Sequence, residues 1–143
     1  MENLLIEHGL KATKGRMEVL RALQTATVPQ SAEDLIEHID SKVVSASSVY
    51  RILSELEHAG VVNKTVRQNA IATYDLTHNH QHFILCSHCG KMIPTDHCPI
   101  ESFEKEVARK TGFKVTGHMV ELVGICPNCQ QALADQSRSH LCT

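Results

Sequence analysis

Two pairs of cysteines constrain the fold of this 143-residue chain more than any other feature of its sequence. Cys86 and Cys89 form one CxxC motif, Cys126 and Cys129 form a second, and 36 residues separate the two motifs. Four thiolates suit a closed tetrahedral zinc site, and a two-residue spacer lets a tight turn present both sulfurs to one ion. Gly90, directly after the first motif, permits the chain to fold back. We therefore predict a structural zinc site at these four cysteines.

Other uses of the cysteines fit the sequence less well. A redox CxxC is expected at the start of a long helix, whereas both motifs fall on predicted strand ends, and one pair would suffice for redox chemistry. Disulfides of a secreted protein are a still weaker alternative. Cys98 and Cys142 have no partner by spacing, and we expect a partly buried thiol and a residue of the tail.

Charge and hydropathy exclude several classes of protein. The formal net charge is −2 and the sequence pI is about 6.5, so no bulk positive field indicates nucleic acid or an anionic membrane. No segment approaches the roughly 18 apolar residues of a spanning helix, and the N-terminus lacks a signal-peptide pattern. We expect a cytoplasmic protein with no membrane partner. The 3% aromatic content, without Trp, leaves little material for stacking on single-stranded nucleic acid.

The chain divides into two parts of different composition. All six cysteines and seven of the ten histidines follow residue 76. The first part has apolar residues at helical spacing over 16–23, a helix start at Ser31 that should run to about residue 39, and a third helix opened by Ser45 and closed by Gly60. Two short strands over 61–66 and 71–76 follow. Three helices and a hairpin predict a winged helix-turn-helix domain over residues 1–76.

The second part, residues 77–143, predicts a small α/β unit. Strands are expected over 81–85 and 91–95, a helix over 100–110 ended by Gly112, and a longer strand over 115–125 that carries His118 and Glu121. Residues 135–143 have the composition of a loose tail. The whole chain is thus predicted to be α+β.

Histidines and one carboxylate form a second candidate metal site. On a strand, residues 78, 80 and 82 point to one face, and neutral imidazoles on one face can hold a metal ion. His80, His82, Glu101 and His118 would supply three nitrogens and one oxygen, which suits zinc without excluding iron, manganese or nickel. The alternative is a solvated, histidine-rich strand with Glu101 as an ordinary acid of the first helical turn.

Six segments, taken in order and spacing, resemble the ferric uptake regulator family. They are GLKAT at 9–13 followed by Arg16, SAEDL at 31–35, SSVYRIL at 47–53, EHAGVV at 57–62, CSHCGK at 86–91 and GHMVELVGIC at 117–126. The resemblance covers nearly the whole chain. It implies a homodimeric, metal-responsive winged-helix repressor of bacterial metal homeostasis, with residues 77–143 as the metal-binding dimerisation domain and tail.

The resemblance also implies which metal sites are present. One of the family's two non-structural sites is matched by His80, His82, Glu101 and His118. The other, which senses iron and peroxide in the peroxide-responsive branch, is matched by residues that cannot ligate a metal, namely Pro29, Gln81, Phe83 and Pro94, and only Asp75 survives. His78, Asp96 and His97 could assemble a variant second site. This pattern points to the zinc uptake regulator branch, with regulatory Zn²⁺, or Fe²⁺ or Mn²⁺ as alternatives.

Residues at the start of the third helix are candidates for contact with double-stranded DNA. Ser45, Ser47 and Ser48, with Tyr50 and Arg51 on the exposed side, suit phosphate and base-edge contacts in a major groove. By the resemblance, Lys11 would read the minor groove, Arg16 would contact the backbone, and the target would be an AT-rich inverted repeat. Residues 1–70 hold eight basic and nine acidic side chains, so we expect few phosphate contacts per chain.

The predicted function is metal-dependent repression of transcription. The favoured form of this function is zinc-sensing control of zinc uptake genes. An iron- or manganese-sensing member of the same family is the alternative. A thiol redox-switched zinc protein is the rival from another class. A zinc hydrolase would need a general base, for which Glu121 is the only candidate, and strand parity places it opposite His118. We therefore expect no enzyme activity.

Overall fold

The chain forms two compact units, residues 1–80 and 81–143. The computed structural model describes residues 1–77, 81–95 and 97–141, without the side chains of 139–141. The sequence predicted the boundary after residue 76, and the structure divides the chain four residues later. Among the described residues, no helix has both the length and the apolar character needed to cross a membrane.

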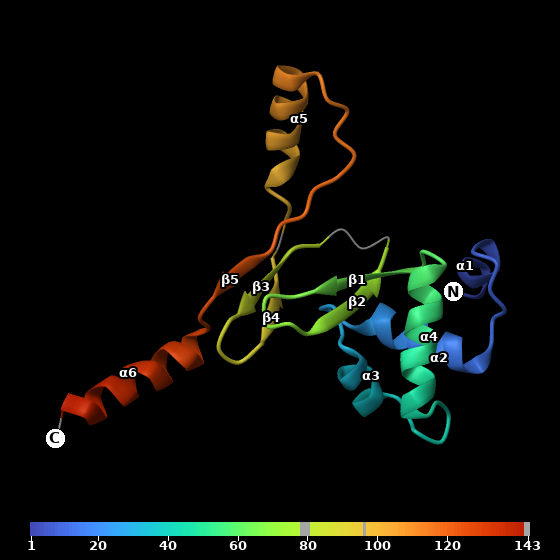
Figure 1. Ribbon diagram of the computed structural model, residues 1–143, viewed down its shortest axis with the longest axis horizontal. Helices are drawn as coiled ribbons and strands as arrows, with labels where there is room; N and C mark the ends of the chain where they lie inside the picture. Colours follow the sequence, from blue (N-terminus) through green and yellow to red (C-terminus); the bar gives the residue numbers. More distant parts are fainter. Residues whose placement is uncertain (78–80, 96, 142–143) are drawn as a thin grey trace. The chain divides into compact units, whose positions relative to one another are not determined.

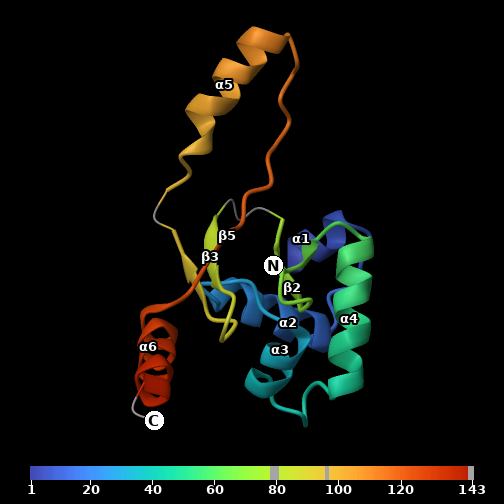
Figure 2. The same ribbon diagram turned by 60° about the vertical axis from the view of Figure 1, so that its left-hand side comes forward.

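The N-terminal unit is a winged helix (Figures 1 and 2). A short helix that the sequence did not predict comes first and buries Leu5 in the core. Three further helices and a two-stranded antiparallel wing follow, as expected. The elements are α1 (Glu2–Glu7), α2 (Lys14–Thr25), α3 (Ala32–His38), α4 (Ala46–His58), β1 (Val62–Val66) and β2 (Ala72–Leu76).

Side chains at the helix starts explain where α3 and α4 begin. The Ser31 hydroxyl accepts from the Asp34 backbone N–H while the Asp34 carboxylate accepts from the Ser31 N–H, which is a complete capping box. The Ser45 hydroxyl accepts from the Ser48 N–H and caps α4 in the same way. After α4, Gly60 takes a φ of 81°, a left-handed conformation that glycine adopts without strain.

One hydrophobic core holds these elements together. Helices α2 and α4 bury the faces that their apolar spacing predicted, and Val61, Val62 and Tyr74 add to the same core from the wing. Residue 30 pairs with Tyr74 through two backbone hydrogen bonds, which ties the segment before α3 to the wing. The side chains without measurable exposure are Leu5, Val19, Leu20, Val49, Leu53, Leu56 and Val61.

The C-terminal unit is a three-stranded mixed sheet with two helices. In the sheet, β3 (Phe83–Cys86) lies between antiparallel β4 (Met92–Pro94) and parallel β5 (Leu122–Gly124). Helix α5 (Ile100–Thr111) ends at Gly112, whose φ of 74° matches the predicted stop. Residues 112–121 return beside α5 in both views, and α6 (Pro127–Leu141) ends the described chain (Figures 1 and 2).

Two expectations for this unit are wrong. Only Leu122–Gly124 of the predicted strand 115–125 is a strand, because β3 offers just three pairing positions on that edge and 112–121 has no strand beside it. The tail predicted over 135–143 is part of α6 as far as residue 141. Pro127 suits the first helical position and Gln, Ala and Leu favour helix, but the segment lacks the apolar stripe that would have signalled it.

Candidate metal centres and nucleic-acid interface

The four cysteines of the CxxC motifs come together in the C-terminal unit. Cys86 is the last residue of β3, and Cys126 and Cys129 lie just before and within the first turn of α6. The second motif is therefore at a helix start, not at the strand end that the sequence predicted. All four sulfurs lie within 4.8 Å of one another, and the Cys89 and Cys126 sulfurs are 3.8 Å apart. Tetrahedral zinc with Zn–S bonds of about 2.3 Å sets sulfurs about 3.8 Å apart.

The electrostatics of this cluster favour a cation. The Cys126 backbone N–H, 3.3 Å from the Cys86 sulfur, and that of Cys89 lower the pKa of Cys86 to about 5, so this thiol is ionised at neutral pH. The neighbouring Cys126 sulfur and burial raise the pKa of Cys129 to about 12. A bound cation would stabilise the thiolate form of all four cysteines, and the donor set is that of structural zinc.

A second ligand group lies where three segments of the C-terminal unit meet. His82 precedes β3, Cys98 precedes α5, and His118 lies on the returning segment. The His82 and His118 Nε2 atoms are 2.9 Å apart, and the Cys98 sulfur is 3.1 Å from the first and 3.4 Å from the second. Tetrahedral zinc would set two nitrogens about 3.3 Å apart and a nitrogen and a sulfur about 3.6 Å apart. The three atoms lie closer together than these edges, so a bound ion would push them slightly apart, and they are near enough to one another to share one ion.

Glu104 on α5 orients one of these imidazoles. Its carboxylate Oε1 lies 2.5 Å from His118 Nδ1, and both side chains are largely covered. A carboxylate accepts, so Nδ1 carries the proton and Nε2, the atom that faces His82 and Cys98, keeps its lone pair. A carboxylate behind the histidine is the usual outer support of a metal-ligating imidazole.

The structure brings together only part of the predicted regulatory set. His82 and His118 meet as expected, while His80, like His78 and Asp96, lies outside the described residues. Glu101 is 77% exposed, forms an ion pair at 3.7 Å with Lys105, and does not join the group. His97 is exposed and Asp75 is half-buried in the wing. Burial raises the pKa of Asp75.

Cys98 is the member of this group that sequence reasoning did not select. Spacing identified the paired cysteines and left a single one as a partly buried thiol. Local spacing gives no signal for such a residue, because Cys98 meets His118 only across twenty residues of sequence.

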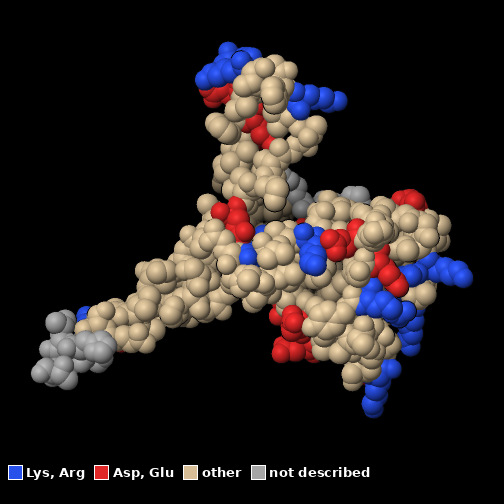
Figure 3. All heavy atoms as spheres, in the orientation of Figure 1, with Lys and Arg blue, Asp and Glu red and all other residues tan. Residues whose placement is uncertain are grey.

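The exposed face of α4 carries most of the residues predicted to contact DNA. Ser45, Ser47, Tyr50 and Arg51 are exposed and Ser48 is half-exposed, while Val49, Leu53 and Leu56 of the same helix are buried, as predicted. The Tyr50 hydroxyl donates to the Glu33 carboxylate at 2.8 Å, which fixes the ring against α3. Figure 3 shows Lys and Arg side chains over the edge of this unit that carries α2 and α4.

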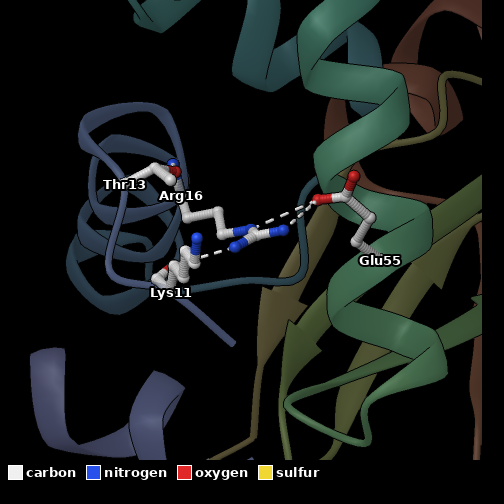
Figure 4. A network of polar contacts seen from close by, with 4 residues as sticks. All are labelled: Lys11, Thr13, Arg16 and Glu55. Atoms are coloured by element: carbon white, nitrogen blue, oxygen red, sulfur yellow. Dashed lines mark hydrogen bonds and ion pairs between the residues drawn. The ribbon is translucent and has the colours of Figure 1, made fainter. Parts of the chain in front are cut away.

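Arg16 joins three parts of this surface (Figure 4). Its Nε and one terminal nitrogen donate to Glu55 Oε2 on α4 at 3.2 and 2.9 Å. The other terminal nitrogen donates to the Lys11 carbonyl at 2.9 Å. The guanidinium therefore braces the loop that presents the exposed Lys11 against α4, a role that the sequence did not predict.

Comparisons with known proteins agree on the family. The Ferric uptake regulator family matches residues 7–123. The ferric uptake regulation protein of Yersinia pestis is 33% identical over 129 residues, which are 86% of this chain and 87% of that protein. The Vibrio cholerae ferric uptake regulator superposes with a TM-score of 0.74 at 29% identity, over 87% of this chain and 98% of that one. The Helicobacter pylori ferric uptake regulator, described as having three functional metal-binding sites, gives a TM-score of 0.72 at 32% identity, over 88% and 86% of the two chains.

Proposed function

The chain belongs to the ferric uptake regulator family, and on that basis we propose that it is a zinc-sensing repressor of zinc uptake genes. Members of this family are metal-responsive, DNA-binding transcription regulators that function as dimers, and they are not enzymes. The hydrolase reading of Glu121 is thereby set aside. We propose, beyond this family membership, which metal the protein senses, which residues bind it and which operator it recognises.

The observation that carries the proposal is the pair of Nε2 atoms of His82 and His118, 2.9 Å apart with Glu104 behind one of them. Two imidazoles aimed at one point, with the tautomer of one fixed, form the core of a metal site. We assign the regulatory ion to this pair and structural zinc to Cys86, Cys89, Cys126 and Cys129. His80, two residues before His82 in the sequence, is the proposed further nitrogen ligand.

Zinc is favoured over iron because three of the positions that match the peroxide- and iron-sensing site, Pro29, Phe83 and Pro94, carry apolar side chains. Pro29 and Phe83 are buried, and Phe83 pairs across the sheet with Pro94. Proline and phenylalanine side chains have no metal-ligating atom, and the Gln81 side-chain amide is a weak ligand for these metals. The second candidate is iron sensing, which the names of the relatives favour.

The proposed mechanism is a shift between populations of the dimer. His82 is the second residue of the C-terminal unit, directly after the division between the units. An ion held by His82, at the start of the C-terminal unit, and His118, on the returning segment, would fix the point at which the chain enters this unit. We propose that this favours the arrangement in which both α4 helices meet half-sites of an AT-rich inverted repeat. The effector acts only if it binds this arrangement more tightly than the others.

Large exposed apolar side chains support dimerisation through the C-terminal unit. No residue of α5 is buried, and Phe103, Phe113 and Met119 are 61%, 75% and 93% exposed. Apolar surface of this kind on a small unit is typical of a protein interface. We propose that a second copy of the chain covers it.

The function is tested by DNA binding at buffered metal concentrations. Duplexes enriched from a random pool by the zinc-loaded dimer are labelled, and their fluorescence anisotropy is followed while free Zn²⁺, Fe²⁺ or Mn²⁺ is varied. We expect Zn²⁺ to promote binding at the lowest free concentration and His118→Ala to abolish the metal response. His88→Ala is the matched control, because this exposed imidazole joins neither ligand group. Metal-independent binding, or an unchanged response in His118→Ala, would reject the proposal.

A further inference from the structure

We propose that the Cys98 thiolate is a ligand of the regulatory ion and that Glu101 is not, which makes this a mixed nitrogen and sulfur site selective for zinc. The inference rests on the proposed function, because it specifies how that same site recognises its metal. It replaces the three-nitrogen, one-oxygen set that the resemblance implied.

The geometry around Cys98 supports this ligand set. The sulfur is 3.1 Å from His82 Nε2 and 3.4 Å from His118 Nε2, so it lies beside both nitrogens that face the proposed ion. The group is partly buried, with His82 only 9% exposed, whereas Glu101 is 77% exposed. A sulfur with two imidazoles is a soft, zinc-type donor set.

Helix α5 explains why the two acids near its start have different roles. Glu101 and Lys105 are four residues apart and pair along the exposed side, as i,i+4 neighbours do. Glu104, one turn further on, instead reaches His118. The helix therefore contributes an orienting carboxylate, and the loop before it contributes the ligand.

A sulfur ligand has a consequence for metal selectivity. Thiolates bind zinc well, while Mn²⁺ prefers carboxylate, carbonyl and water oxygens. A three-nitrogen, one-oxygen site would discriminate less between these ions. The Cys98 sulfur therefore explains why this chain would sense zinc, although the relatives that it resembles are named for iron.

Cobalt spectroscopy tests the proposal directly. The full-length dimer, with zinc retained in the four-cysteine site and the second ion removed by mild chelation, is titrated with Co²⁺, a zinc substitute. A thiolate ligand gives cobalt an intense near-ultraviolet sulfur-to-metal charge-transfer band, which nitrogen and oxygen ligands do not produce. We expect this band in the wild type and in Glu101→Gln. We expect no such band in Cys98→Ser. Zinc analysis before and after the titration confirms that cobalt has not exchanged into the four-cysteine site.

Affinity measurements accompany the spectra. Loss of a direct ligand in Cys98→Ser should weaken zinc binding by at least about 100-fold, more than the roughly 10- to 100-fold expected for an outer-shell partner. Cys98→His restores a nitrogen ligand and should recover part of the affinity without the band. Glu101→Gln should change the affinity less than about threefold, as expected for an exposed pair.

The outcomes separate this inference from the function on which it rests. If no second cobalt ion binds, both the regulatory site and the Cys98 assignment are wrong. If cobalt binds with no sulfur band, or with a band that persists in Cys98→Ser, only the Cys98 assignment is overturned. A large loss of affinity in Glu101→Gln, with none in Cys98→Ser, would restore the oxygen ligand.

Discussion

Replacing Arg16 tests whether this residue braces the DNA-binding unit or serves only as a contact for DNA. Arg16→Met keeps the aliphatic stem and removes the guanidinium, and with it two hydrogen bonds to Glu55 and one to the Lys11 carbonyl. The Arg16 and Glu55 side chains are 17% and 32% exposed, so solvent screens the pair only in part. We expect lower stability of the N-terminal unit and a displaced Lys11 loop.

The loss of stability in Arg16→Met is estimated from this intermediate exposure of the ion pair. Hydrogen bonds to charged groups contribute about 1.5–3 kcal/mol when sheltered, and exposed ion pairs contribute about 0–1 kcal/mol. We therefore expect a coupling of about 1 kcal/mol between Arg16 and Glu55, and a total loss of about 2 kcal/mol with the Lys11 bond. For a unit of this size, that loss lowers Tm by about 10 °C.

Tyrosine fluorescence provides a selective assay. The chain has no Trp, and its two tyrosines, Tyr50 and Tyr74, both lie in the N-terminal unit, so their signal in the full-length dimer reports that unit. A double-mutant cycle with Arg16→Met and Glu55→Gln isolates the coupling. If Arg16 contacts only a phosphate, Tm stays unchanged and the slope of log binding constant against log salt concentration falls by about 0.9 for each chain of the dimer. That result would refute the bracing role.

Four further changes have defined outcomes. Leu53 has no measurable exposure, and Leu53→Ala should lower the tyrosine-monitored free energy of unfolding by about 2–5 kcal/mol. It should also weaken DNA binding, although the Leu53 side chain does not contact DNA. A loss of stability below about 1 kcal/mol would contradict the packing. Glu104→Gln should lower zinc affinity roughly 10- to 100-fold in a competition titration with a chelator, and an unchanged affinity would show that Glu104 does not orient His118. Phe103→Asp should raise the dimer dissociation constant in sedimentation experiments, and an unchanged constant would place the interface elsewhere. Burial raises the pKa of Asp75, so its carboxylate destabilises the folded unit as pH rises through that pKa; Asp75→Asn should raise Tm at pH 7 and lose this advantage below pH 3.8, whereas a lower Tm at pH 7 would reverse the sign.

The local signals in the sequence predicted the N-terminal unit well. The Ser31 capping box, the apolar spacing of α4 and the left-handed Gly60 each determine structure within a few residues, and each appears as expected. Leu5 was missed because a six-residue helix has too few positions to show a period.

The C-terminal unit depends on partners that a single sequence does not reveal. The apolar pattern over 115–125 predicted a strand, but among the described residues only 122–124 pair with a strand, and side chains such as Met119 are exposed. Cys98 joins His118 across twenty residues of sequence, and nothing in local spacing distinguishes a lone ligand from a lone thiol. The four-cysteine group was predictable because two short motifs specify their own geometry.

The most direct test of the account is native mass spectrometry of the metal content per chain, before and after mild chelation. We expect two zinc ions per chain in a dimer, one removed readily and one retained. His118→Ala should hold only the retained ion. One tightly bound ion, with no second ion taken up from zinc, iron or manganese, would contradict a regulatory site at His82 and His118 and leave the four-cysteine zinc as a purely structural element.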